Sequence, residues 1–310
     1  MKTCFSILLF FLLTQTLHSQ RFEYVESHMG TEFRIVFYTS DETLANAAAA
    51  AAFRRIDELE QIFSDYIPGS EVSRLSATAG TGEKVLVGDD LWKVLSFSQR
   101  VAKETKGAFD VTAGALTKLW RRAFRQKKFP EEADLEAAGK TVGYKKLKLY
   151  KKQRVELSTA GTLLDFGGVA KGYAVDEAMK VLKQHGISAA MIDGGGDIAV
   201  SDAPPGQPGW AIERSVYKAG KLDSQMFFLS NKAVATSGDT YRYLEWEGKR
   251  YSHILDPRTG MGVTTRQIVT VLASTCMEAD AWATAMSVEA DTDVYLHLKK
   301  KGLEVTFSQY

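Results

Sequence analysis

Cysteine is almost absent from this 310-residue chain, which contains only Cys4 and Cys276. Cys4 lies in an N-terminal segment that we expect to be removed, so only Cys276 would remain in the mature protein. A single remaining cysteine excludes an intrachain disulfide. No cluster of cysteine with histidine is present to bind a soft metal. The fold must therefore be stabilised by packing and by ligands.

An excess of charge of either sign is also lacking. The chain has 39 Lys and Arg against 38 Asp and Glu, which gives a formal net charge of +1. Removal of residues 1–19 takes away Lys2 alone, so the mature chain would be neutral. A neutral chain without a basic block argues against nucleic acid as the main partner. The content of 45% apolar and 25% charged residues is typical of a soluble globular protein.

A hydrophobic run long enough to cross a membrane is missing at the N-terminus. The apolar stretch from Phe5 to Leu13 follows Lys2 and is followed by polar residues and the small Ser19. This layout is typical of a secretory signal peptide. We expect residues 1–19 to be a signal peptide and residues 20–310 to form the mature domain; a buried N-terminal helix is the alternative. The expected location is the periplasm or the outer face of the inner membrane.

The first half of the chain predicts a strand at 33–40 and two helices. Thr39 and Glu42 have the spacing of a capping box, and the alanine-rich helix that follows should end near the Pro-Gly loop at 67–71. A second helix is expected over 89–107, with Gly107 as its stop. We interpret the lysine-rich residues 121–154 as a solvated loop and a short strand; a phosphate-binding patch is the alternative.

The second half predicts a helix after the glycine pair at 167–168 that stops at Gly186. Further expected elements are a strand, triple-glycine turn and strand over 187–202, a buried strand at 266–274 and a helix at 276–290. Strands and helices are interspersed without strict alternation. This order favours an α+β fold of mixed sheets flanked by helices.

The segment "GGVAKG" (167–172) has two glycines at Walker A spacing, but Tyr173 stands where that motif requires lysine. It also fails the glycine spacing of the dinucleotide fingerprint. Glycines allow a backbone to approach a ligand, and a helix N-terminus attracts phosphate, to which Lys171 would add a positive charge. A simple strand-to-helix turn is the alternative. "DGGGD" (193–197) likewise indicates either a tight hairpin or a close backbone approach.

Asp280 and Thr284 are four residues apart in "EADAWATA" and therefore share one helix face. A carboxylate and a hydroxyl offer two hard oxygens, which suit Mg²⁺. The alternative is that Thr284 bonds to its own backbone and Asp280 is a solvated acid at the helix start.

His253 precedes a rigid turn in "YSHILDPRTG" (251–260), where Pro257 presets the backbone and Gly260 releases it. Alternation predicts that Tyr251, His253 and Leu255 share one strand face. The histidine is either structural or a general base or phosphate contact, since imidazole titrates near neutrality.

Six blocks in a fixed order resemble the ApbE family, the FAD:protein FMN transferases (flavin transferases). They extend over about residues 22–290 and read "FSDYIPGSEVSRLS", "GAFDVTAGALTKLW", "LLDFGGVAKGYAVD", "IDGGGDIAV", "AVATSGDTYRYLEWEGKRYSHILDPRTG" and "EADAWATA". The resemblance implies a Mg²⁺-dependent enzyme that splits the pyrophosphate of FAD. Such an enzyme passes FMN to a Thr or Ser hydroxyl of a target protein and releases AMP.

The resemblance also implies roles for individual residues. Mg²⁺ would be held by the carbonyl of Ala170 with Asp280 and Thr284, Lys171 would lie near the phosphates, and His253 would activate the acceptor hydroxyl. The implied flavin contacts are Met29, Tyr66, Ala108, Phe109, Asp110 and Asp165. Tyr66 and Phe109 would offer aromatic faces. The implied acceptor is an exported protein, by analogy a subunit of a membrane redox complex.

Two other functions stay open at this level. A Mg²⁺-dependent FAD pyrophosphatase would use water in place of the protein hydroxyl and release free FMN and AMP. A periplasmic protein that only binds FAD would need neither Asp280, Thr284 nor His253, and all three are present. The intact set of residues favours the transferase.

Overall fold

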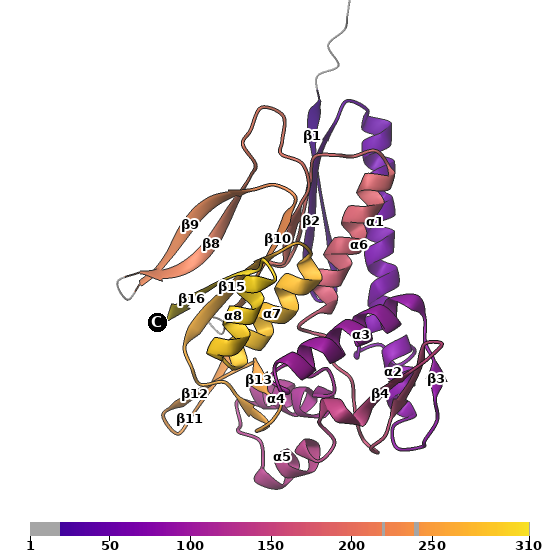
Figure 1. Ribbon diagram of the computed structural model, residues 1–310, viewed down its shortest axis with the longest axis vertical. Helices are drawn as coiled ribbons and strands as arrows, with labels where there is room; N and C mark the ends of the chain where they lie inside the picture. The colour runs from indigo at the N-terminus through magenta and orange to yellow at the C-terminus, as the bar shows by residue number, and fades with distance from the viewer. Residues whose placement is uncertain (1–18, 219–220, 239–241, 310) are drawn as a thin grey trace, which may run out of the picture.

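The computed structural model describes residues 19–218, 221–238 and 242–309 (Figure 1). The expected signal peptide lies outside these residues except for Ser19. The helices are α1 (Glu42–Phe63), α2 (Glu71–Ala77), α3 (Asp89–Glu104), α4 (Gly114–Gln126), α5 (Glu132–Gly139), the 3-10 helix η1 (Tyr144–Lys146), α6 (Ala170–Gln184), α7 (Cys276–Val288) and α8 (Thr292–Lys300).

Seven strands form the main sheet, in the order β1 (Gln20–His28), β2 (Thr31–Thr39), β6 (Ala190–Gly194), β7 (Ile198–Val200), β10 (Lys232–Gly238), β15 (Gln267–Ala273) and β16 (Glu304–Gln309). Every neighbouring pair is antiparallel. The smaller sheets contain β3 (Val85–Leu86), β4 (Leu147–Tyr150) and β5 (Arg154–Leu157); β8 (Trp210–Lys218) and β9 (Lys221–Leu229); β11 (Tyr243–Trp246) and β12 (Lys249–Ser252); and β13 (Leu255–Asp256) and β14 (Met261–Gly262).

Both faces of the main sheet are buried, and strand β2 contributes apolar side chains to each of them. Phe33, Ile35 and Phe37 belong to the large core formed with the helices, whereas Val36 packs with Val234 in a second core. Successive side chains of a strand point to opposite faces, so an apolar run supplies both cores. Residues from β8 and β9 complete the second core, and this long hairpin extends away from the body of the molecule (Figure 1).

Helices α1 and α6 lie side by side against the sheet, with α7 beside them (Figure 1). The alanines of α1 that face inward are fully or almost fully buried at Ala45, Ala48, Ala49 and Ala52. Small side chains let neighbouring helices approach closely, as the alanine run predicted. Helix α7 is apolar almost all round because α3, α6, β10 and β15 surround it.

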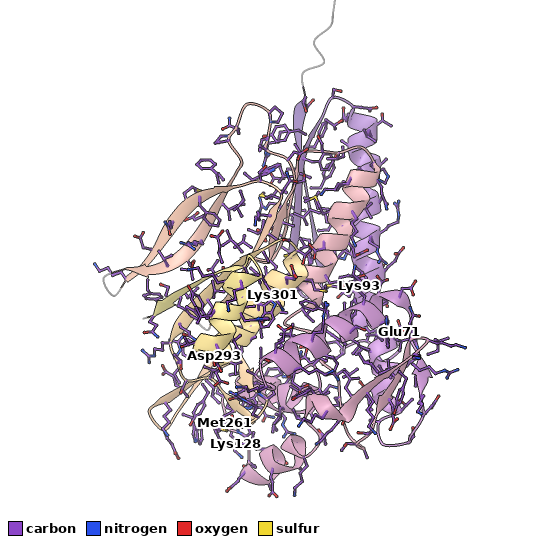
Figure 2. The ribbon with its side chains drawn as sticks, in the orientation of Figure 1. Glu71, Lys93, Lys128, Met261, Asp293 and Lys301 are labelled. Atoms are coloured by element: carbon purple, nitrogen blue, oxygen red, sulfur yellow. The ribbon has the colours of Figure 1, made fainter. Side chains whose placement is uncertain are left out.

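Charged side chains join the outer helices. Lys93 of α3, labelled in Figure 2, lies 3.3 Å from Glu177 of α6, and Arg55 of α1 reaches the same carboxylate at 3.2 Å. Arg55 also contacts Asp90 of α3 at 2.6 Å. This network connects three helices at the edge of the large core.

The structure confirms most of the predicted elements and corrects three details. The capping side chain of α1 is Asp41, which accepts the Leu44 N–H at 3.0 Å, because Thr39 is still the last residue of β2. Residues 121–154 are not mainly loop: they contain the end of α4, all of α5 and β4, and the start of β5. The predicted triple-glycine hairpin is confirmed between β6 and β7.

The third correction concerns the strand around His253. Strand β12 ends at Ser252 and β13 begins at Leu255, so the histidine lies in a bend. Tyr251 and Leu255 pack in a small core around Trp120, whereas the side chain of His253 is exposed. The alternation across this segment is broken by the bend, and the predicted common face is wrong.

The architecture is the α+β fold predicted from the sequence, with antiparallel sheets flanked by helices. Within the described part of the chain, none of the helices combines the length and apolar character needed to cross a membrane.

Candidate functional site

The start of α6 and the middle of α7 meet at very short range. The Gly172 N–H donates to Asp280 Oδ2 at 3.2 Å. A Cβ on Gly172 would lie 2.4 Å from the Cys276 carbonyl oxygen, and one on Gly168 would lie 2.9 Å from Thr284 Oγ1. Glycines at these two positions therefore allow the "GGVAKG" segment to lie directly against the acid and the hydroxyl of α7.

Lys171 brings a third segment to this place. Its ammonium group is paired with Asp197, the residue that follows the triple-glycine turn, and lies 3.9 Å from Asp280 Oδ2. In that turn Gly195 and Gly196 have φ angles of +75° and +96°, which side-chain-bearing residues rarely adopt. Both predictions for "DGGGD" thus hold: it is a tight hairpin, and a Cβ on Gly195 would lie only 2.5 Å from Thr31 Oγ1. The hairpin also brings Asp197 to the start of α6.

Asp280 is buried, and the residue is only 4% exposed. Burial, followed by the negative charge of Asp197, raises the pKa of Asp280 to about 7, while Lys171 opposes the shift. Two buried carboxylates thus face one ammonium group. An additional cation beside Asp280 would compensate the remaining negative charge.

The donor atoms at this place fit a hard cation. Thr284 Oγ1 lies 3.3 Å from Ser237 Oγ on β10, so its hydroxyl points toward a side chain. Asp280 is buried, which contradicts the alternative of a solvated acid at the helix start. Carboxylate, hydroxyl and backbone carbonyl oxygens are the ligands that Mg²⁺ prefers. Asp280, Thr284 and a carbonyl of the 167–172 segment are therefore the residues that would hold Mg²⁺.

The structure adds residues to this group that the sequence reasoning missed. Ala170 begins α6, but the residue of its segment that lies against the Thr284 hydroxyl is Gly168. Ser237 and Asp197 also belong to the group. Two features of the sequence could have indicated Gly168 and Asp197: the glycine two positions before Ala170 and the acidic residue directly after the triple glycine.

A second set of predicted residues is brought together by two parallel segments. Asp165 N donates to Val111 O at 2.8 Å, and Gly114 N to Leu163 O at 3.0 Å. Asp110 is buried and accepts the N–H and the hydroxyl of Thr112 at 2.8 and 2.7 Å. Burial raises the pKa of Asp110, although these bonds from Thr112 oppose the shift.

The predicted flavin contacts differ in exposure. Ala108 and Phe109 are buried, and Phe109, only 4% exposed, belongs to the large core. Its ring therefore does not offer the exposed aromatic face that we expected. Tyr66 is 69% exposed and does offer one. Met29 lies in the β1–β2 turn with a φ of +50° and packs against the large core.

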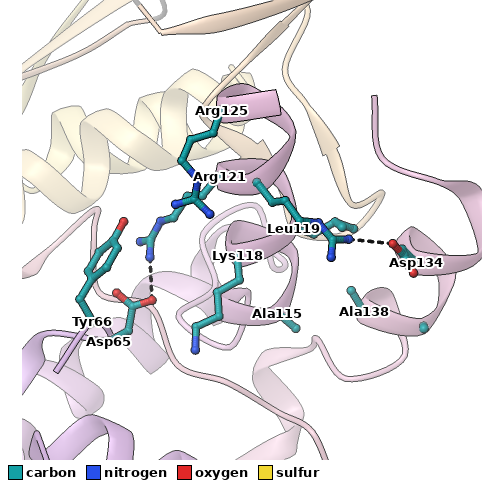
Figure 3. Close-up of a pocket in the computed structure, with 11 residues that line it drawn as sticks. Asp65, Tyr66, Ala115, Lys118, Leu119, Arg121, Arg125, Asp134 and Ala138 are labelled. Carbon is teal, nitrogen blue, oxygen red and sulfur yellow. Dashed lines mark hydrogen bonds and ion pairs between the residues drawn. The ribbon is translucent and has the colours of Figure 1, made fainter. Parts of the chain in front are cut away.

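A cleft of about 550 Å³ opens beside Tyr66, with one wall formed by α4 (Figure 3). Arg121 links the cleft to the predicted flavin residues, because its guanidinium donates to Asp65 at 2.6 Å and to Asp165 at 3.2 Å. The same guanidinium lies 4.6 Å from the centre of the Tyr66 ring. The cationic side chains that line the cleft are Lys118, Arg121, Arg122 and Arg125. Such a volume suits an organic ligand, and its lining suits an anionic one.

His253 is positioned by a separate part of the fold. Its backbone N–H and its ring Nδ1 both lie 3.1 Å from the carbonyl oxygen of Arg242. The turn that follows is locked by Arg258, whose guanidinium contacts Asp256 at 2.9 and 2.8 Å. The carbonyl of Gly260 accepts the Trp120 indole N–H at 2.8 Å, which docks the turn on α4.

Known proteins resemble this chain over nearly its whole length. The model of the ApbE family matches residues 29–307. A protein from Haemophilus influenzae named FAD:protein FMN transferase is 31% identical and covers 89% of this chain and 83% of its own length. One of the same name from Klebsiella pneumoniae is 28% identical, covering 89% of this chain and 81% of its own.

Solved structures agree with this result. The flavin transferase ApbE from Vibrio cholerae has a TM-score of 0.84 and 26% identity, covering 94% of this chain and 97% of that one. The ApbE protein from Thermotoga maritima has a TM-score of 0.81 and 29% identity with the same coverage. These findings confirm the predicted fold and the predicted class of enzyme. The chain belongs to the ApbE family.

Proposed function

We propose that this enzyme transfers FMN from FAD to a Thr or Ser hydroxyl of an exported protein, in a reaction that depends on Mg²⁺ and releases AMP. FAD as the donor and a protein as the acceptor follow from the name that the relatives share. The observation that carries the proposal is the meeting of Gly168, Lys171 and Gly172 with Asp280 and Thr284.

The proposed reaction exchanges one phosphorus–oxygen bond for another. The acceptor oxygen bonds to the phosphorus of the FMN half, the pyrophosphate bond breaks, and AMP leaves with the bridging oxygen. Transfer of a phosphoryl group depends mainly on positioning and on neutralisation of charge. Mg²⁺, when bound, would supply part of that neutralisation by polarising phosphate oxygens.

The chain's own residues account for the remaining requirements. Lys171 would lie near the phosphates at the α6 N-terminus, where backbone N–H groups favour an anion. Its charge is offset by Asp197 and Asp280, so bound Mg²⁺ would be what makes this group net positive. Tyr66 and Arg121 in the cleft would receive the flavin end. His253 would accept the proton that the hydroxyl loses, a role that contributes about 10²–10⁴-fold in rate.

The proposal is tested with purified protein, FAD, Mg²⁺ and an acceptor that carries a flavinylation motif. The expected result is a fluorescent acceptor band on a denaturing gel, together with one AMP for each FMN attached. Free FMN and AMP with a dark acceptor would favour the pyrophosphatase. Intact FAD in the presence of Mg²⁺ would contradict both enzymatic readings.

The assignment of residues is tested in the same assay. Asp280→Ala should abolish Mg²⁺-dependent turnover while the protein stays folded, and His253→Gln should slow transfer without changing the binding of Mg²⁺. Asp223→Ala, at an exposed position on β9, is the matched control and should leave turnover unchanged. Full activity of Asp280→Ala would refute the metal assignment.

We also propose export to the periplasm as the location, because the pattern of residues 1–19 is that of a signal peptide. The acceptor would then be an exported protein, by analogy a subunit of a membrane redox complex.

A further inference from the structure

A histidine and two carboxylates converge at the end of β1, and none of the three belongs to the group around Asp280. His28 is the last residue of β1, and Asp57 and Glu60 lie one turn apart on α1. One ligand atom from each of the three lies within 4.8 Å of those of the other two. His28 Nδ1 is 3.9 Å from Glu60 Oε2. No other group of three such residues is found within 19–218, 221–238 and 242–309.

The imidazole of His28 is held in a fixed orientation. Its ring stacks on Phe53 at 5.7 Å with an interplanar angle of 19°, and it meets the edge of Phe33 at 6.3 Å. The side chain is only 11% exposed. Because both aromatic residues belong to the large core, the histidine cannot turn away from α1 without losing these contacts.

A third carboxylate selects the ring nitrogen that faces α1. Glu26 Oε2 lies 3.1 Å from His28 Nε2, on the other side of the ring from Glu60. A carboxylate can only accept a hydrogen bond, so this contact places the proton on Nε2 and leaves the lone pair on Nδ1 directed toward α1. Metal-binding histidines are commonly oriented in this way, by a carboxylate on the ring nitrogen that does not bind the metal.

We propose that His28 Nδ1, Asp57 and Glu60 bind a divalent transition-metal ion, with Zn²⁺ as the best match, and that Glu26 positions the histidine. One imidazole nitrogen and two carboxylate oxygens form a mixed donor set that suits Zn²⁺, whereas Mg²⁺ and Ca²⁺ favour oxygen ligands alone. The bound ion would join the end of β1 to the C-terminal part of α1. This site is distinct from the residues proposed to hold Mg²⁺.

The test is a titration of the purified full chain with Zn²⁺ in excess Mg²⁺, so that a site of oxygen ligands alone is already occupied. We expect one equivalent of Zn²⁺ to bind and X-ray absorption at the zinc edge to show one imidazole ligand. His28→Gln, Asp57→Asn and Glu60→Gln should each weaken binding at least about 10-fold. Glu26→Gln should weaken it about 10–100-fold, as is typical when a carboxylate that orients a ligand is lost.

Two control variants match these changes at other positions. Glu58→Gln removes an exposed carboxylate of the same helix, and His297→Gln removes a histidine that pairs with one glutamate, Glu104, at 3.3 Å. Both should bind Zn²⁺ as the unaltered protein does. Circular dichroism checks that each variant is folded; if His28→Gln is not, Asp57→Asn decides, because Asp57 is exposed. Absence of Zn²⁺ binding, or equal binding by the folded ligand variants, would overturn the proposal.

Discussion

Replacement of Gly172 by alanine should destabilise the protein, although alanine is the better helix former. In an ordinary helix interior the change would stabilise by about 1 kcal/mol. Here the added Cβ would lie 2.4 Å from the Cys276 carbonyl oxygen and 2.9 Å from Asp280 Cβ. The first distance is about 1 Å shorter than ordinary van der Waals contact. Backbone atoms cannot rotate away, so α6 and α7 must separate.

Overpacking of a core costs about 1–3 kcal/mol, and a clash with backbone belongs at the upper end of that range. After subtraction of the gain in helix propensity, we expect a net loss of about 2 kcal/mol in the free energy of unfolding. Urea unfolding measures this loss, and the FMN transfer assay should show reduced turnover because Asp280 is displaced from the 167–172 segment.

The control is Gly139→Ala, since a Cβ at the last residue of α5 would meet nothing within 4 Å. That variant should be as stable as the unaltered protein or slightly more stable. If Gly172→Ala is also as stable as the unaltered protein, α6 and α7 are not in the close contact described here. These glycines would then not determine the position of Asp280.

Two predictions concern pH. The pKa of Asp280 is raised to about 7, and a carboxylate must lose its proton to bind a cation. The affinity for Mg²⁺ should therefore fall about tenfold for each pH unit below that value. Calorimetric titrations at several pH values measure this affinity, and an affinity independent of pH would refute the raised pKa. Burial alone would raise the pKa of Glu177, but the cationic groups of Lys180, Arg55 and Lys93 outweigh it and lower this pKa to about 2. A lowered pKa means that Glu177 stabilises the fold above the usual carboxyl pKa and loses this effect as the pH falls toward 2. Glu177→Gln should therefore be less stable than the unaltered protein at neutral pH, with the gap closing on acidification in urea unfolding; a gap independent of pH would contradict the ion-pair network.

Elements with strong local signals were predicted correctly from the sequence. Three examples are the alanine run of α1, the glycine that stops α6 and the apolar run of β15. Each of these signals can be recognised within one segment of the sequence. The errors occurred where the local signal was weak or where a distant segment decides the local structure. Residues 132–139 form α5 although none of its side chains is buried, so the sequence lacked the apolar periodicity that reveals a helix.

For the proposed metal group, the sequence predicted the type of ligand but not every residue that lies there. The helical spacing of Asp280 and Thr284 predicted a pair of oxygen ligands, and the glycine pair at 167–168 indicated a close approach. Ser237, in contrast, comes from a strand whose sequence gives no sign of a ligand, and it reaches Thr284 only because β10 lies beside α7. Contacts between elements far apart in sequence are set by the packing of the sheet.

Helix α4 connects the two ends of the proposed site through adjacent residues. Trp120 donates to the carbonyl of Gly260 and so holds the turn after His253, while Arg121 holds Asp65 and Asp165 beside the cleft. Neighbouring helix residues point about 100° apart, so one helix can contact both regions at once. A shift of α4 would therefore displace the histidine and the cleft wall together. The rigid turn after His253 acts through this contact, because it holds the histidine in a fixed position relative to α4.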